Sequence, residues 1–102
     1  MEGLEMICFK IIAGVGAARS CFIEAMQIAR KGDYEKAEQL IQDGEKEFVN
    51  AHQAHAELIT NEANGNKTDV TLLLLHAEDQ LMSAEGFKIL AAEFIDVYKR
   101  LK

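Results

Sequence analysis

Lys31-Gly32-Asp33 is one of only two stretches at which the helical pattern of this chain is broken. Glycine readily takes the left-handed conformation that ends a helix, and aspartate accepts hydrogen bonds from the first amides of the next helix. The second stretch is Gly65-Asn66-Lys67-Thr68-Asp69, where the glycine again predicts a helix end and Thr68 or Asp69 a helix start. The sequence therefore predicts three helices, over about residues 3–31, 34–64 and 69–101.

The composition fits a single domain over residues 1–102. Of the 102 residues, 49% are hydrophobic and 27% are charged, which is an ordinary globular mixture. The chain contains no proline, so nothing in the sequence interrupts long helices. We expect an all-α fold, an antiparallel three-helix bundle whose helices run up, down and up.

The charge balance limits the classes of partner. The chain has 11 basic and 17 acidic residues, for a net charge of -6. Nucleic-acid binding needs a basic surface, so we expect no nucleic-acid partner. No uninterrupted apolar run approaches the roughly 18 residues of a membrane-spanning helix, and the start Met1-Glu2-Gly3 lacks the basic region of a signal peptide. These features predict a cytoplasmic protein.

The third predicted helix has more apolar surface than one stripe can account for. One side carries Leu72, Leu75, Met82, Ile89, Leu90 and Val97. Another side carries Val70, Leu73, Leu74, Ala77, Leu81, Ala84, Ala91, Ile95 and Tyr98. Because an apolar arc wider than about 100° indicates burial on two sides, we expect this helix to contact other subunits as well as its own bundle.

Small residues gather in the middle of the first predicted helix, over Ala13-Gly14-Val15-Gly16-Ala17-Ala18. Each glycine inside a helix costs roughly 1 kcal/mol relative to alanine, so its position needs a reason. We interpret the run chiefly as close helix packing, and a place where another group approaches the backbone is the alternative.

Four polar side chains interrupt the third helix on one face. His76, Asp79, Gln80 and Ser83 follow the spacing i, i+3, i+4 and i+7 among large apolar residues. Because burying an unpaired carboxylate is costly, Asp79 in this seam needs a partner, a proton or a metal.

Three interpretations of this cluster are open from the residues alone. The first is a satisfied polar cluster that fixes the register of the helices. The second is a metal site, because a histidine and an aspartate at i, i+3 can ligate one cation, and His52 and His55 repeat that spacing on the second helix. The third is a nucleophilic imidazole at His76.

The nine residues from Leu75 to Ser83, Leu-His-Ala-Glu-Asp-Gln-Leu-Met-Ser, resemble a known signature. It is the His-Gly/Ala-Gln-Asp-His-Leu-Met-Thr/Ser run of the lactose/cellobiose-specific IIA components of the phosphoenolpyruvate-dependent sugar phosphotransferase system. Shorter matches occur along the whole chain. They are Ile11-Ile12-Ala13-Gly14, Ala18-Arg19-Ser20, Ala29-Arg30-Lys31-Gly32-Asp33-Tyr34, Ala51-His52 and Val97-Tyr98-Lys99-Arg100.

The resemblance implies a homotrimer that carries phosphate. The histidine matched by His76 takes a phosphoryl group from the phosphocarrier protein HPr and passes it to a cysteine of the cognate IIB component, which phosphorylates an incoming disaccharide. The membrane is involved only through the IIB/IIC permease. The aspartate matched by Asp79 lies on the three-fold axis and binds a divalent cation with its symmetry mates; oxygen ligands favour a hard ion, and we expect Mg²⁺.

A phosphorylated histidine gains a charge of about -1.5 to -2 and needs hydrogen-bond donors. Gln80, Ser83 and His52 are the candidate donors. We assign Gln80 and His52 to the catalytic site beside His76, with a polar cap on the second helix as the equal alternative for His52.

The chain departs from the family pattern in three places. Glu78 replaces a glutamine, Gln80 replaces a second histidine, and His55 stands where many members have glutamine. Gln80 can still donate a hydrogen bond, but it cannot carry a positive charge. We expect Glu78 to point to solvent and His55 to have a structural role. These departures leave a second hypothesis open, a non-catalytic, metal-linked helical oligomer with a regulatory or scaffold role.

Overall fold

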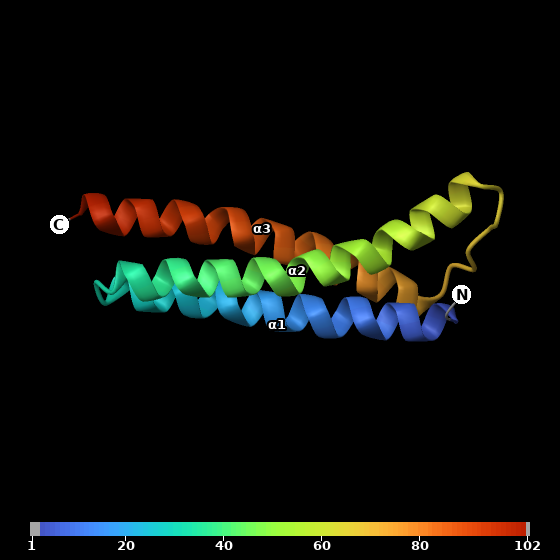
Figure 1. The fold of residues 1–102 in the computed structure, drawn as a ribbon, viewed down its shortest axis with the longest axis horizontal. Coiled ribbons are helices and arrows are strands. Elements are labelled where there is room, and N and C mark those ends of the chain that lie inside the picture. The colour runs from blue at the N-terminus through green and yellow to red at the C-terminus, as the bar shows by residue number, and fades with distance from the viewer. Residues whose placement is uncertain (1–2, 102) are drawn as a thin grey trace.

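The computed structural model describes residues 3–101 and consists of three long helices, α1 (Leu4–Arg30), α2 (Tyr34–Ala63) and α3 (Leu72–Arg100). The first and third helices point the same way and α2 points the opposite way, in a slender body of 54 × 21 × 17 Å (Figure 1). No strand occurs in residues 3–101. The predicted up-down-up three-helix bundle is confirmed.

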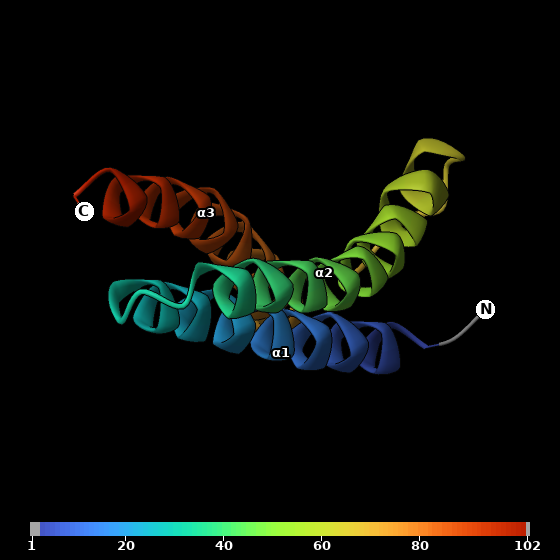
Figure 2. The same ribbon diagram turned by 60° about the vertical axis from the view of Figure 1, so that its left-hand side comes forward.

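The first helix makes most of the contacts that hold the bundle together. It contacts both other helices, whereas α2 and α3 share a much smaller contact surface. Figure 2 shows why, since the last turns of α2 and the last turns of α3 diverge from α1 at opposite ends of the molecule. Eight buried side chains recur along α1 at steps of one to four residues, namely Ile7, Cys8, Ile11, Val15, Ala18, Phe22, Ala25 and Ala29.

Both predicted helix ends at glycine are confirmed. Gly32 and Gly65 have φ angles of 94° and 92°, and they are the positive-φ residues of the described chain. After each glycine the next amide donates back across the turn, from Asp33 to the carbonyl of Ile28 and from Asn66 to that of Asn61. A side chain at either glycine would be strained, so these two residues fix where α1 and α2 stop.

The helix starts are predicted less well. Asp33 caps α2 as expected, with its carboxylate accepting a hydrogen bond of 3.2 Å from the Lys36 amide. The prediction that α3 starts at Thr68 or Asp69 is wrong, because the cap is Thr71, whose hydroxyl accepts from the Leu74 amide at 3.1 Å. Two adjacent β-branched residues, Val70 and Thr71, disfavour the extra helical turn, and a hydroxyl at the second of them supplies the cap.

Two glycines let the helices approach closely. A Cβ atom on Gly14 would lie 3.2 Å from the Cβ of Ala51, and one on Gly44 would lie 2.6 Å from the ring of Phe22. Close packing at Gly14 confirms the main interpretation of the small-residue run in α1. Gly16, by contrast, has nothing within 4 Å of such an atom.

The first helix is also apolar enough over 18 residues to cross a membrane by length and composition. In this bundle its apolar side chains at the buried positions form the core against α2 and α3. The core helix of a soluble bundle passes the same test, so the composition of α1 does not assign it to a membrane.

Candidate functional site

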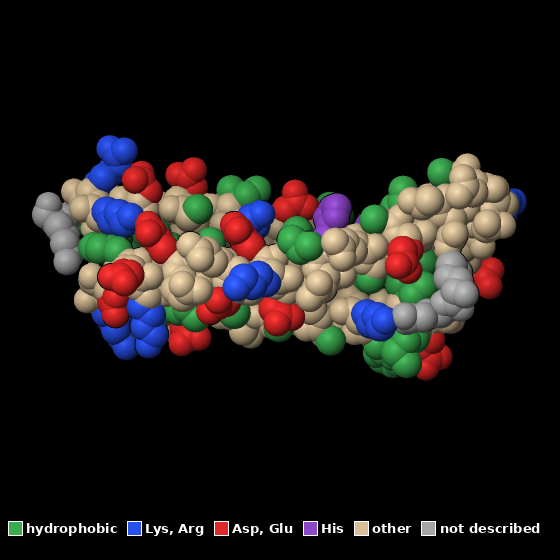
Figure 3. Space-filling view, in the orientation of Figure 1, with side chains coloured by type: hydrophobic (Ala, Val, Ile, Leu, Met, Phe, Trp, Pro, Cys, Tyr) green, Lys and Arg blue, Asp and Glu red, His purple; other side chains and the backbone are tan. Residues whose placement is uncertain are grey.

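His76 lies in the second turn of α3 and its side chain is exposed. The Thr71 cap fixes where this helix begins, and buried Leu74 and Ala77 fix its rotation against the core. Figure 3 shows one face of the molecule, over which acidic, basic and hydrophobic side chains are interspersed. The exposed imidazole of His76 is open to a large partner, which a buried histidine would not be.

Gln80 follows His76 by four residues and is held by α1. Its carbonyl oxygen accepts a hydrogen bond of 2.9 Å from an Nη atom of Arg19, in partly buried surroundings. The guanidinium carbon of Arg19 also lies 5.8 Å from the centroid of the Phe87 ring on α3. Residues four apart on a helix lie about 5–6 Å apart at Cβ, so Gln80 and Arg19 flank the same side of α3 as His76.

Glu78 points to the other side of α3 and is paired. Its carboxylate lies 2.5 Å from Nε2 of His55 on α2, with the glutamate side chain 39% and the histidine side chain 17% exposed. Glu78 is therefore partly exposed, as expected, but its carboxylate is also paired with a residue of α2, which was not expected. Two residues along a helix turn the side chain by about 200°, so the contact with α2 and the exposed imidazole of His76 lie on different sides.

The pair also affects the α1 thiol nearest to it. The pKa of the fully buried Cys8 is raised, first by burial and then by the negative charge of Glu78. Burial and the carboxylates of Asp43, Glu24 and Glu47 likewise raise the pKa of Cys21. Both thiols are free, and a raised pKa keeps them protonated and poorly nucleophilic near neutral pH.

His52 lies in the seam between α2 and α3. Its exposed ring is 6.1 Å from the ring of Phe48, and the Lys88 ammonium of α3 lies 5.7 Å from that same phenyl centroid. Within residues 3–101 no hydrogen bond or ring contact joins His52 to His76. A role for His52 as a donor to His76 thus remains a prediction that one chain by itself does not test.

The outward face of α3 is apolar around one acid. Asp79 is exposed, and within residues 3–101 it makes no hydrogen bond or ion pair. Six large apolar side chains at helical spacing around Asp79 are exposed as well. They are Leu72 at 83%, Met82 at 71%, and Leu75, Ile89, Leu90 and Val97. These six make up one of the two apolar sides that the sequence predicts for this helix, and Val70, which belongs to the other side, is 73% exposed as well.

No group of three histidine, cysteine or carboxylate side chains in the described part of one chain could hold a metal ion. The repeated histidine spacing on α2 therefore forms no metal site with α3 in a single subunit. The carboxylate of Asp79 is accessible and unpaired, so it fits a cation only if other chains supply the remaining ligands.

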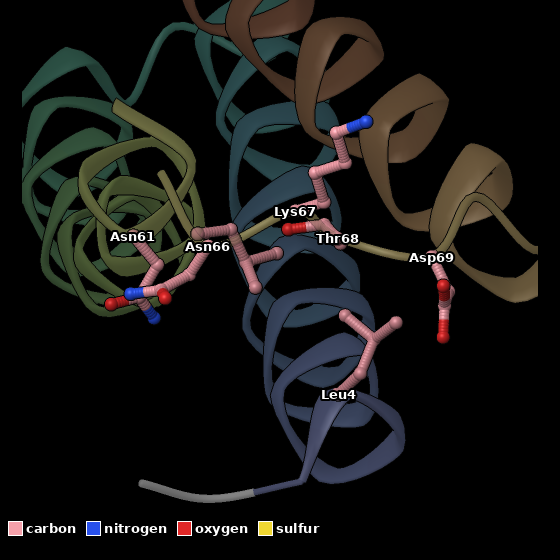
Figure 4. A pocket seen from close by; sticks show the side chains of 7 residues that line it. Leu4, Asn61, Asn66, Lys67, Thr68 and Asp69 are labelled. Carbon is pink, nitrogen blue, oxygen red and sulfur yellow. The ribbon is translucent and has the colours of Figure 1, made fainter. Parts of the chain in front are cut away.

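A hollow lies elsewhere, at the end of the bundle where α2 connects to α3 (Figure 4). It has a volume of about 450 Å³ and is lined by Leu4, Leu58, Asn61, Asn66, Lys67, Thr68 and Asp69. None of these is a predicted site residue, so this hollow is separate from the surface that carries His76.

Comparison with known proteins identifies this arrangement. Residues 6–99 match the family described as "PTS system, Lactose/Cellobiose specific IIA subunit". The chain belongs to the lactose/cellobiose-specific IIA family. Its members are phosphotransferase components of the sugar phosphotransferase system, so the IIA chain is a component of that kind.

Relatives and solved structures cover nearly all of the IIA chain. The lichenan-specific phosphotransferase enzyme IIA component of Bacillus subtilis is 45% identical over 100 residues, which are 98% of this chain and 91% of that protein. The lactose-specific EIIA component of Staphylococcus aureus is 35% identical, over 97% and 96% of the two chains.

The fold of the IIA chain is that of solved IIA proteins. The cellobiose-specific enzyme IIA from Bacillus anthracis superposes with a TM-score of 0.93 at 42% identity, over 99% of this chain and 94% of that one. A IIA(Chitobiose) chain in complex with HPr superposes with a TM-score of 0.85 at 29% identity, over 99% and 98% of the two chains.

Sequence reasoning missed two features of the site. It gave no role to Arg19, although this is the single basic residue of α1 between Lys10 and Arg30. It also treated His55 and Glu78 as separate departures from the family pattern, whereas they contact each other. Both features depend on contacts between helices, and helical periodicity along one segment does not reveal the partner on another.

The contact between His55 and Glu78 is testable by a double-mutant cycle. We expect His55→Gln and Glu78→Gln each to lower the free energy of unfolding by about 1 kcal/mol, because each leaves a partly buried polar group without its partner. The double variant should lose less than the sum of the two. Urea unfolding at pH 7 and at one protein concentration measures the free energy of unfolding of the wild type, the two single variants and the double variant. The exposed pair of Arg100 and Asp96 is the matched control, where coupling should be much smaller; equal coupling in the two cycles would contradict the prediction.

Proposed function

We propose that this IIA chain is a phosphocarrier whose His76 accepts a phosphoryl group from HPr and passes it to a cysteine of the cognate IIB component during uptake of a disaccharide. The observation that carries the proposal is the exposed imidazole of His76 on α3, at the position of the family histidine, in a bundle similar to a IIA chain solved with HPr. The names of the relatives differ in the sugar, so the family assigns no particular sugar to this chain.

The transfer step needs little from the protein beyond positioning. The unprotonated ring nitrogen of His76 attacks phosphorus in line, and its lone pair forms the N–P bond. The bond from phosphorus to the donor atom breaks, and its electron pair stays on that atom. In the onward step a thiolate of IIB forms the S–P bond and the N–P electron pair returns to the ring. Both partners are proteins, so an accessible histidine suits the reaction better than an enclosed one.

The assembly that we propose is a homotrimer in the cytoplasm. The outward apolar face of α3 supports it, because exposed side chains such as Leu75 and Met82 are covered when three α3 helices meet. Asp79 then lies among them with its two symmetry mates. Three carboxylates at one axis repel one another, and a divalent cation such as Mg²⁺ would neutralise them. This cation site is structural and takes no part in the transfer step.

Phosphorylation by the purified donor system tests the function. The protein is incubated with labelled phosphoenolpyruvate, enzyme I and HPr, and we expect one acid-labile phosphate per chain on the wild type and none on His76→Ala. His52→Ala removes a histidine predicted only to donate to the phosphoryl group, so the label should stay on His76 even where transfer is slower.

Two outcomes would overturn the proposal. Label that persists in His76→Ala assigns the phosphate to another residue. An unlabelled wild type favours the second hypothesis, a non-catalytic metal-linked oligomer in which the face of α3 serves assembly alone.

A further inference from the structure

We infer that Arg19 is a positioning residue for the phosphoryl group on His76, acting through the side chain of Gln80 and through its own positive charge. The inference deepens the proposed function and rests on it. It is carried by the contact between α1 and α3.

The first observation is the orientation that Arg19 gives to the Gln80 amide. The guanidinium donates to Oε1 of Gln80 at 2.9 Å, so the acceptor end of the amide is occupied. An amide has one acceptor end and one donor end, and fixing the first leaves the NH₂ group to donate elsewhere. His76 lies one turn earlier on the same side of α3. The amide is thereby oriented as a donor for a group bound to that ring.

The second observation concerns charge. Gln80 cannot be cationic, and the two acids nearest to His76 in sequence, Glu78 and Asp79, add negative charge to this stretch of α3. Glu78 is directed to His55 on the α2 side. On the α1 side, Arg19 is the basic residue in contact with this segment of α3. A phosphoryl dianion on His76 would find its positive counter-charge there.

The third observation is that Arg19 is held in place from a second side. Its guanidinium lies 5.8 Å from the Phe87 centroid, which together with the Gln80 contact restricts a side chain that is otherwise flexible. Arginine can donate through five N–H groups, and one of them is used by Gln80. The guanidinium of Arg19 is thus held in place and still has N–H groups free to donate. Such a group can stabilise the negative charge of the phosphoryl group, which appears at His76 only after the transfer.

Two properties of the phosphorylated protein test the inference, the rate of phosphoryl transfer from HPr and the pKa of phospho-His76 followed by ³¹P NMR. Removing the cation in Arg19→Gln should slow transfer by about tenfold. It should also raise the pKa of phospho-His76 by about half a unit, because a nearby positive charge disfavours the protonated ring. Arg19→Lys keeps the charge and should restore the pKa but not the rate, since one ammonium group does not reproduce the planar contact with Gln80.

Arg100→Gln is the matched control, since it removes an exposed arginine that pairs with Asp96 at the far end of α3. It should change neither the rate nor the pKa. Gln80→Leu should slow transfer and leave the pKa nearly unchanged, and it provides the test from α3 if Arg19→Gln does not fold. An unchanged rate and an unchanged pKa of phospho-His76 in Arg19→Gln would overturn the inference. If that variant does not fold, equal transfer rates in wild type, Arg19→Lys and Gln80→Leu would overturn it. An unlabelled wild type would instead overturn the proposed function, so the two failures are distinguishable.

Discussion

Glutamate in place of both Leu75 and Met82 is expected to convert the proposed trimer into a monomer. Both side chains are exposed in the single chain, at 55% and 71%, and both lie on the same face of α3 as Asp79. In the proposed trimer, each substitution would place three more carboxylates near an axis that already holds three. The desolvation and mutual repulsion of these charges have no compensating partner. Sedimentation velocity at micromolar concentration measures the change, and circular dichroism should show that the helices remain.

Asp79→Leu is the informative counterpart on the same face. It removes the axial carboxylate and adds an apolar side chain, so we expect the trimer to persist while bound divalent metal is lost. The expected loss of metal is tested by measuring the metal content of the dialysed protein by mass spectrometry. A wild type that sediments as a monomer would contradict the trimer, and metal content unchanged by Asp79→Leu would contradict the role of the axial acid.

The second large effect is expected inside the bundle, at Gly44. A Cβ atom there would lie 2.6 Å from the Phe22 ring and 3.0 Å from the Cβ of Cys21. Phe22 is completely buried, so its ring cannot move into solvent to make room. We expect Gly44→Leu to lower the free energy of unfolding by about 3 kcal/mol. Denaturant unfolding measures the change, at a fixed protein concentration because assembly contributes to apparent stability.

Gly16→Ala is the matched control for that substitution. It is a glycine in the middle of a helix with nothing within 4 Å of the new methyl group. The substitution should raise the free energy of unfolding by about 1 kcal/mol, because alanine is the better helix former. If both variants shifted stability in the same direction, helix propensity and not the contact with Phe22 would decide the effect at Gly44.

Taken together, these predictions separate the core of the bundle from the outer face of α3. The core is sensitive to volume, as Gly44 of α2 and Phe22 of α1 illustrate. The outer face of α3 is expected to be sensitive to charge, because its exposed apolar side chains would be covered in the proposed assembly. His76 lies at the border between the two, where an imidazole is fixed by a rigid helix and still reached by a protein partner.

The sequence by itself determined the number of helices, their order and the wide apolar surface of α3. Glycines at 32 and 65 act locally, through a backbone conformation that other residues avoid, and helical periodicity depends only on residue spacing. The motif around His76 identified the family for the same reason, since its residues are consecutive. The start of α3 was missed because several residues from 68 to 71 can cap a helix. Which of them does so depends on how the whole segment packs, and the local sequence does not show this.

Only the tertiary structure decided which helix meets which side of α3. Periodicity places residues on the faces of their own helices, but it gives no partner on another helix for His55, Glu78, Arg19 or Gln80. Packing against α1 rotates α3 so that Gln80 meets Arg19 on one side and Glu78 meets His55 on the other. That rotation is set by the sum of many small core contacts, from Ile7 to Ile95, and no single segment of sequence contains it.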